Sequence, residues 1–189
     1  MKIGIFPGTF DPIHIGHESI IAEAVNSNIV DKIIIIPAFR NPWKETPTVP
    51  FIDRFNMCHI AAENINNLIG HKKVFASAIE NTMHDLQNNG PIYTANILKY
   101  LKYICANDTL CLLCGTDVKE NIINWHDGQW IIDNCEIINV DRLGMTSVSI
   151  EKGIKISSTA IREMLKNNEM PYPYISKDVY DYIKKNHLY

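Results

Sequence analysis

Short apolar runs alternate with amphipathic segments along the chain, and this alternation predicts strands separated by helices. The predicted strands are apolar runs rich in Ile, Val and Leu, at residues 2–6, 32–37, 73–76, 109–114 and 136–140. In the segments between and after them, apolar residues recur every three or four positions, as on one face of a helix. The predicted helices cover residues 18–25, 51–64, a segment that includes 97–104, a segment after 159, and 177–185.

Strands that alternate with helices predict an α/β protein, with a Rossmann-like, doubly wound parallel sheet and helices on both faces. The 189 residues predict a single domain over 1–189, with a small helical part from about 157 to 189. Ligands of such sheets bind outside the carboxyl ends of the strands. Polar clusters follow three predicted strands and precede a late helix, at residues 8–17, 41–44, 115–117 and 157–162. We therefore expect one binding site at this edge of the sheet.

Charge and composition narrow the classes of partner. The formal net charge of −3 argues against a nucleic-acid partner, because proteins that bind nucleic acid usually carry a stripe of basic residues. No apolar run approaches the roughly 18 residues of a membrane span, so we expect no membrane partner. The first residues lack the pattern of a secretory signal, and five cysteines, an odd number, suit a reducing compartment. We therefore expect a cytoplasmic protein, either a monomer or a homo-oligomer.

Cys111 and Cys114 have the C-x-x-C spacing of zinc and redox sites. Residues three apart in a strand point to opposite faces, however, and this pair lies in a predicted strand. No second cysteine pair or nearby histidine completes a zinc set. We therefore expect buried thiols and no metal site.

The stretch FPGTFDPIHIGH, residues 6–17, links the first strand to the first helix. Gly8 lets the backbone approach a ligand closely, and Gly16 leaves room above the helix N-terminus. That terminus presents free N–H groups and partial positive charge, which suit a phosphate. His14 and His17 are three residues apart, so in a first helical turn they would face the same ligand. Capping histidines and a zinc pair are the less favoured alternatives.

A second helix start has similar chemistry. Ser157, Ser158 and Thr159 carry hydroxyls that either cap a helix or bind phosphate, and Arg162 can reach the same anion. The motif is not a Walker A loop, because G-x-x-x-x-G-K-[ST] is absent from the sequence. No G-x-G-x-x-G follows the first strand either, which argues against a redox Rossmann protein.

Together these motifs resemble those of the nucleotidyltransferase superfamily. Residues 14–17 resemble its H-x-G-H signature, and residues 156–162, ISSTAIR, resemble its I-S-S-T-x-x-R element. The first turn resembles that of bacterial nicotinate-nucleotide adenylyltransferases. Pro7 and the segment 41–44 instead resemble pantetheine-phosphate adenylyltransferase. The segments PIYTA at 91–95, GTD at 115–117 followed by Trp125, and VDR at 140–142 resemble the first family.

The resemblance implies adenylyl transfer from ATP to nicotinate mononucleotide, which gives deamido-NAD and pyrophosphate in NAD biosynthesis. Mg²⁺ would be carried with ATP. The implied catalytic residues, which neutralise the phosphates, are His14, His17, Lys44 and Arg162. The implied ATP-binding residues include His14, His17 and Arg162 and add Gly8, Thr9, Phe10, Gly115, Asp117, Ser157 and Ser158. The mononucleotide would be bound by Lys44, Tyr93, Thr94 and Trp125.

Alternatives remain open at this point. Three of these residues also have a plainer interpretation: Lys44 as a solvated lysine, Asp117 as a helix cap and Trp125 as a core residue. The sequence departs from the family pattern at Ile97, His126 and Trp43. These positions affect the pocket for the mononucleotide, so the preference between nicotinate and nicotinamide mononucleotide is undetermined. The rival functions are a pantetheine-phosphate adenylyltransferase and a non-catalytic nucleotide-binding module.

Overall fold

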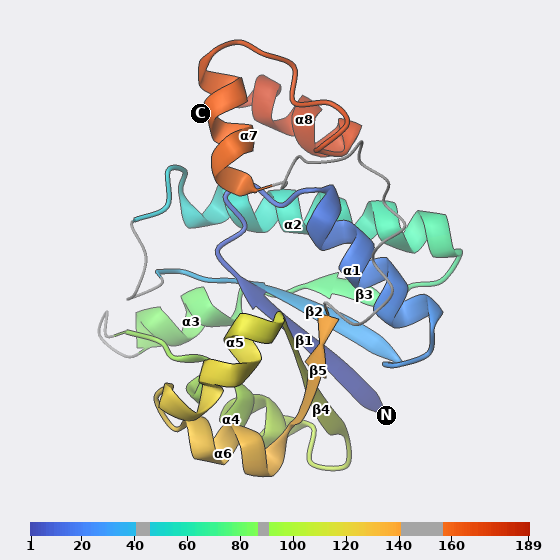
Figure 1. Cartoon of the computed structure of the whole chain (residues 1–189), viewed down its shortest axis with the longest axis vertical. Coiled ribbons are helices and arrows are strands. Elements are labelled where there is room, and N and C mark those ends of the chain that lie inside the picture. The colour runs from blue at the N-terminus through green and yellow to red at the C-terminus, as the bar shows by residue number, and fades with distance from the viewer. Residues whose placement is uncertain (41–45, 87–90, 141–156) are drawn as a thin grey trace.

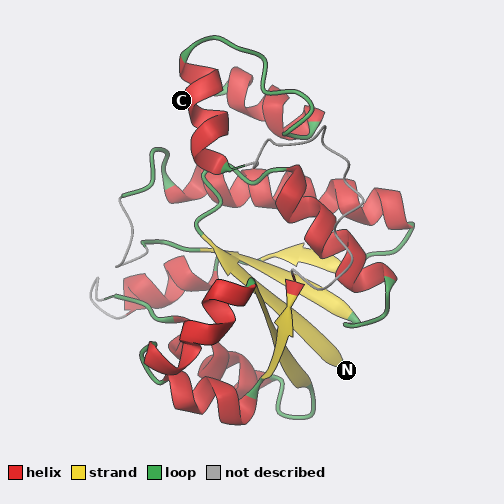
Figure 2. Ribbon diagram, viewed as in Figure 1, coloured by secondary structure: helices red, strands yellow, loops and turns green. Residues whose placement is uncertain are grey.

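A five-stranded parallel sheet forms the centre of the molecule (Figure 2). The computed structural model describes residues 1–40, 46–86, 91–140 and 157–189. The strands are β1 Lys2–Gly8, β2 Lys32–Pro37, β3 Val74–Ala76, β4 Thr109–Cys114 and β5 Glu136–Asn139. Their order is β3-β2-β1-β4-β5, so the direction of winding reverses between β1 and β4. This order confirms the predicted Rossmann-like α/β fold and places its switch point at the end of β1.

Helices cover both faces of the sheet (Figure 1). One face packs against α1 Ile15–Asn26 and α2 Phe51–Ile69, with α7 Ser158–Lys166 and α8 Lys177–Lys185 joining the same core. The other face packs mainly against α4 Thr94–Ile104 and the shorter α3 Ile79–Leu86, α5 Thr116–Asn121, η1 Ile122–Asn124 and α6 Gly128–Asn134. In the described part of the chain, none of the helices combines the length and the apolar composition that a membrane span requires.

The strands are apolar on both sides because helices bury both sides. Ile33 and Ile35 of β2 belong to the core under α1 and α2, whereas Ile36 belongs to the opposite core. The same alternation separates Cys111 from Cys114, which lie in different cores on opposite faces of the sheet. Burial raises the pKa of the Cys111 thiol to about 11. The two thiols are therefore apolar core residues and do not face one ligand.

Some element boundaries differ from those predicted. α1 begins at Ile15, three residues before the predicted start, and α2 continues to Ile69 before Gly70, with φ of 73°, ends it. α3, α5 and α6 were not predicted, because segments of six to eight residues carry too few apolar positions for a clear period. The predicted helix that includes 97–104 begins at Thr94, three residues after Pro91, a residue type that favours the first turn of a helix. The sequence also has a short apolar run at 154–156, before the hydroxyl motif, and it lies outside the described residues.

α7 and α8 lie beside α2 at one end of the molecule (Figure 1). Ile161 of α7 and Val179 and Ile183 of α8 are fully buried in the core that α1 and α2 share. These helices are therefore fixed against the first half of the chain. The division at about residue 157 stays a prediction.

Candidate active site

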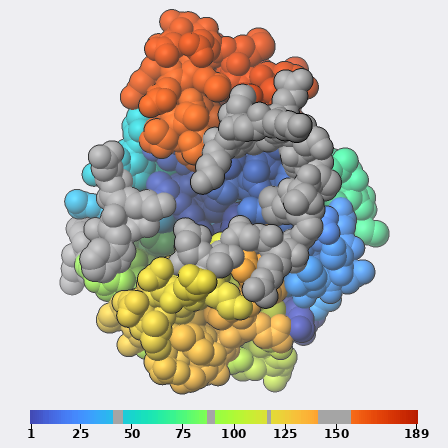
Figure 3. Space-filling view, viewed as in Figure 1, coloured from blue at the N-terminus to red at the C-terminus, as the bar shows by residue number. Residues whose placement is uncertain are grey.

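A cavity of about 450 Å³ opens at the carboxyl edge of β1, β2 and β4. In the space-filling view a hollow lies between α7 and the α5–α6 region, with N-terminal residues at its floor (Figure 3). Because parallel strands end together here, the polar loops that follow them surround one space. The lining residues are Phe6, Pro7, Gly8, Thr9, Phe10, His17, Ala38, Arg40, Glu80, Ile92, Tyr93, Thr94, Leu112, Leu113, Cys114, Gly115, Val118, Trp125, His126 and Ser158.

The turn after β1 folds its own aromatic side chain back over the strand end. Phe10 has φ of 48°, in the left-handed region, and its ring is buried. A Cβ on Gly8 would lie 2.8 Å from that ring, so glycine is required here for the close approach of Phe10. Phe10 in turn meets the His17 ring edge-on, with 5.1 Å between ring centroids. The turn therefore positions His17 against the cavity.

His14 and His17 form a stacked pair at the start of α1. Their ring centroids are 3.7 Å apart, and the backbone N–H of His14 donates to Nδ1 of His17 over 3.3 Å. This bond assigns the proton of a neutral His17 ring to Nε2. A Cβ on Gly16 would lie 3.1 Å from the His14 ring, so the missing side chain makes room for that ring. His17 lines the cavity, whereas His14 lies behind it.

Two buried polar atoms of this turn have no hydrogen-bond partner among the described residues. They are Oγ1 of Thr9 and Nδ1 of His14. Burial lowers the pKa of His14 to about 4, so its imidazole is neutral at physiological pH. Buried polar atoms are usually satisfied, so the unsatisfied hydroxyl of Thr9, which lines the cavity, points to a polar ligand. The turn is therefore suited to bind an oxygen-rich group.

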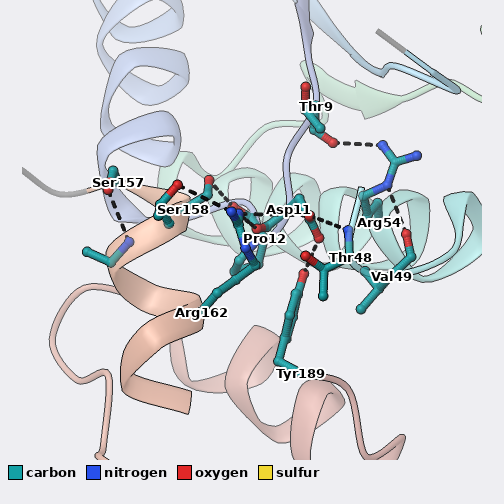
Figure 4. Close-up of polar contacts among 12 residues, drawn as sticks. Thr9, Asp11, Pro12, Thr48, Val49, Arg54, Ser157, Ser158, Arg162 and Tyr189 are labelled. Carbon is teal, nitrogen blue, oxygen red and sulfur yellow. Dashed lines mark hydrogen bonds and ion pairs between the residues drawn. The ribbon is translucent and has the colours of Figure 1, made fainter. Parts of the chain in front are cut away.

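The late hydroxyl motif contacts the first turn directly (Figure 4). Oγ of Ser158 donates to the Pro12 carbonyl oxygen over 2.9 Å, and Nη1 of Arg162 donates to the Asp11 carbonyl oxygen over 2.7 Å. Oγ of Ser157 accepts from the Ala160 N–H over 3.1 Å, so Ser157 is the N-cap of α7. The N-terminus of α7 is thereby docked on residues 11–12, beside the N-terminus of α1.

A buried arginine joins the first turn to the segment after β2. Arg54 is 1% exposed, and its Nη1 donates to the carbonyl oxygens of Thr9 over 2.7 Å and Ala38 over 2.6 Å. Its Nη2 donates to the Phe39 carbonyl oxygen over 3.1 Å. Burial lowers the pKa of this guanidinium. Arg54 therefore fixes two walls of the cavity relative to each other.

Glu80 of α3 holds the same segment from the other side. Its Oε1 accepts the Phe39 N–H over 2.9 Å, and the residue is 5% exposed. Burial raises the pKa of Glu80 to about 7, against the opposing effects of the Phe39 N–H and the Arg54 charge. A buried carboxyl group whose pKa is raised therefore lines the cavity.

Aromatic side chains form the far side of the cavity. Trp125 follows η1, and the rings of Tyr93 and His126 stack with 4.3 Å between centroids. Thr94 opens α4 at the same wall, so the free N–H groups of a helix N-terminus lie beside the aromatic residues. Such a wall offers a flat ring a stacking surface and an acidic group N–H donors.

Comparisons with known proteins agree with this arrangement. A family model described as cytidylyltransferase-like matches residues 5–164. The chain belongs to the cytidylyltransferase-like family. Within that family it groups with the nicotinate-nucleotide adenylyltransferases. The probable nicotinate-nucleotide adenylyltransferase of Dehalococcoides mccartyi is 32% identical, over 100% of this chain and 97% of the relative. The Carboxydothermus hydrogenoformans protein of that name is 29% identical, over 100% and 98%.

A solved structure of this family has the same fold. The Plasmodium falciparum nicotinic acid mononucleotide adenylyltransferase, complexed with NaAD, superposes with a TM-score of 0.71 at 22% identity. The superposition covers 99% of this chain and 96% of the other. The family model and the relatives confirm the predicted resemblance to the nicotinate-nucleotide adenylyltransferases of the nucleotidyltransferase superfamily, and this superposition confirms the fold.

The cavity brings most of the residues predicted for this adenylyltransferase family together. Nine of them line it: Gly8, Thr9, Phe10, His17, Tyr93, Thr94, Gly115, Trp125 and Ser158. Three others do not line it. His14 stacks on the lining residue His17, Ser157 caps α7 next to Ser158, and Arg162 donates to Asp11, next to Phe10. Lys44 and the side chain of Asp117 lie outside the described part of the chain. Within that part, no group of three His, Cys, Asp or Glu residues is placed to hold a metal ion.

Sequence reasoning missed several residues of the site. Arg40 and Glu80 line the cavity, and Asp11 and Arg54 support the first turn. His126, noted above only as a departure from the family pattern, also lines the cavity. For Arg54 a signal existed, because position 54 continues the apolar stripe through 58, 61 and 65 on α2. A charged residue on a buried stripe needs hydrogen-bonding partners. Glu80 had no such signal, because α3 itself was not predicted.

Proposed function

We propose that this protein transfers the adenylyl group of ATP to nicotinate mononucleotide, forming deamido-NAD and pyrophosphate. The observation that carries the proposal is the contact between the two motifs. The H-x-G-H turn and the N-terminus of α7, remote in sequence, border one cavity with an aromatic wall opposite. The name shared by its relatives, and their coverage of the whole chain, favour this function over adenylyl transfer to phosphopantetheine.

In the proposed reaction, an oxygen of the mononucleotide phosphate attacks the α-phosphorus of ATP in line. The new P–O bond forms as the bond from the α-phosphorus to the bridging oxygen breaks, and pyrophosphate leaves with its charge on that oxygen. ATP enters as its magnesium complex, so Mg²⁺ is part of the substrate. Such reactions depend mainly on positioning and charge neutralisation, and no protein nucleophile is needed.

The residues of the first turn would contact the triphosphate. His17 lines the cavity and, with Nδ1 occupied by the His14 N–H, presents its Nε2 proton to a phosphate oxygen. His14 supports its ring by stacking, and Thr9 supplies a hydroxyl. Ser158 and Arg162 would act from the α7 side, and Lys44 from the loop after β2. Preorganised donors of this kind stabilise the charge that develops in the transition state.

The aromatic wall would bind the mononucleotide. Trp125, which lines the cavity, would stack on the pyridine ring, and the N–H groups at the start of α4, near Tyr93 and Thr94, would receive the nicotinate carboxylate. Gly115 and Asp117 would contact ATP. The preference for the acid over the amide depends on this wall, where His126 stacks on Tyr93.

A substrate panel tests the proposal. The protein is incubated with magnesium ATP and either nicotinate mononucleotide, nicotinamide mononucleotide or phosphopantetheine, and pyrophosphate release is followed. We expect the highest kcat/KM with nicotinate mononucleotide. The highest value with phosphopantetheine would identify the rival enzyme. ATP binding with no pyrophosphate from any acceptor would identify a nucleotide-binding module.

We place the reaction in the cytoplasm, which is consistent with the five free cysteines.

A further inference from the structure

The Asp11 carboxylate joins the first turn to two distant segments (Figure 4). Asp11 is 5% exposed, so its two oxygens depend on protein donors. Oδ1 accepts the Tyr189 hydroxyl over 2.8 Å, and Oδ2 accepts the Thr48 N–H over 2.7 Å. The pKa of Tyr189 is raised, mainly by burial and secondly by the negative charge of Asp11. The hydroxyl therefore stays protonated and remains a donor.

Arg162 lies next to this carboxylate without forming a close ion pair with it. Its Nη1 is 3.8 Å from Oδ2 of Asp11, whereas charge-assisted N–H···O bonds are about 2.7–2.9 Å long. The short bond of Nη1, 2.7 Å, goes to the neutral carbonyl oxygen of Asp11, and Nη2 donates to Oγ1 of Thr159 over 3.3 Å. The guanidinium is therefore positioned by neutral acceptors while the nearest carboxylate is occupied by other donors.

We propose that Tyr189 is a positioning residue that keeps the charge of Arg162 available to the phosphates of ATP by holding the Asp11 carboxylate. This inference rests on the proposed function, because it assigns Arg162 to the triphosphate. Tyr189 touches neither the cavity nor the reacting atoms. It acts through Asp11 and Arg162.

The physical reason is the cost of an unsatisfied buried carboxylate oxygen. Without the Tyr189 hydroxyl, Oδ1 of Asp11 would be buried without that donor, which is costly for a charged acceptor. The side chain of Arg162 is 22% exposed, and its Nη1 already lies 3.8 Å from Oδ2 of Asp11, so the carboxylate would turn toward it. Arg54 is less available, because its N–H groups already donate to carbonyl oxygens. ATP would then have to break a close Asp11–Arg162 pair in order to bind.

The test is Tyr189→Phe, which removes the hydroxyl and keeps the ring. The dissociation constant of magnesium α,β-methylene ATP is measured by calorimetry, so the reading does not depend on the second substrate. We expect the constant to rise about tenfold. In an Arg162→Gln background, the same substitution should change it by less than about twofold, because the arginine through which it acts is gone.

Tyr182→Phe is the matched control. The Tyr182 hydroxyl also donates to a carboxylate, Oδ1 of Asp53 over 2.9 Å, and accepts from Asn56 over 2.8 Å, but both partners lie on α2 away from the cavity. This variant should bind the analogue as the wild type does. A second variant, Tyr189→Phe with Asp11→Asn, should restore affinity to within about threefold of wild type, since a neutral amide does not capture a guanidinium.

Several outcomes would overturn the inference. Unchanged affinity in Tyr189→Phe is one, and equal weakening with and without Arg162 is another, because the tyrosine would then act through general structure. Failure of Asp11→Asn to restore affinity also contradicts it. A wild-type protein that binds the analogue but releases no pyrophosphate would overturn the proposed function, while the affinity series would still decide the role of Tyr189.

Discussion

Replacing Glu80 with glutamine is expected to change how the stability of the protein depends on pH. Burial raises the pKa of Glu80 from 4.5 to about 7 in the folded state. Below pH 4.5 the carboxyl group is protonated in both the folded and unfolded states. As the pH rises from 4.5 to 7, the unfolded chain loses the proton while the folded protein keeps it, so the free energy of unfolding falls.

The size of this effect follows from the shift. Each unit of pKa difference corresponds to about 1.4 kcal/mol, so the complete loss is about 3 kcal/mol. Between pH 5 and pH 8, where measurements are practical, it amounts to about 2.5 kcal/mol. Glutamine keeps an oxygen that can accept the Phe39 N–H, but it has no titratable group, so its variant lacks this loss.

The comparison of the two proteins isolates Glu80. Burial lowers the pKa of His14 from 6.5 to about 4, so its contribution to stability is lost as the pH falls through that range. This opposite effect masks the Glu80 titration in the wild type. It is present in both proteins, so it cancels when the difference between them is taken.

The assay is urea unfolding followed by tryptophan fluorescence, for wild type and Glu80→Gln at pH 5 and pH 8. We expect the variant to gain about 2.5 kcal/mol relative to the wild type between these values. A difference that stays constant within about 0.5 kcal/mol would show that the Glu80 carboxyl titrates as it does in water. The wall of the cavity would then be open to solvent at this point.

Two further substitutions test the geometry of the site. Gly16→Ala places a Cβ 3.1 Å from the stacked His14 ring. We expect kcat, measured by pyrophosphate release, to fall by about tenfold or more, while the melting temperature, measured by calorimetry, stays nearly unchanged. Unchanged kcat would show that the histidine stack is not needed. Trp125→Ala should raise the KM for nicotinate mononucleotide by about tenfold and leave the KM for ATP unchanged, measured by steady-state kinetics. Equal effects on both would place Trp125 in general packing.

Local features of the site were predictable from the sequence. The H-x-G-H turn and the hydroxyls before α7 are helix starts, and short-range chemistry governs both. The strands could be predicted because a sheet buried on both faces demands continuous apolar runs such as KIIIIP at Lys32–Pro37. The meeting of the two motifs at one sheet edge followed from the topology of parallel sheets.

The supporting network was not predictable in the same way. Asp11 is 178 positions from Tyr189 and 151 from Arg162, and only tertiary packing brings them together. The missing side chains of Gly8 and Gly16 were expected to leave space for a ligand. In the structure, the Phe10 ring lies against Gly8 and the His14 ring lies against Gly16. Ser157 has the plainer role of a helix cap. Each of these outcomes depends on side chains that fold back locally or arrive from far away, and periodicity contains no information about either.

The most direct test of the account compares wild type with His17→Ala in the formation of deamido-NAD from magnesium ATP and nicotinate mononucleotide. Removing one preorganised donor from the triphosphate should lower kcat by about 100-fold or more, with the melting temperature nearly unchanged. Turnover close to that of the wild type would show that the turn after β1 does not hold the reacting phosphates, and would contradict the central claim.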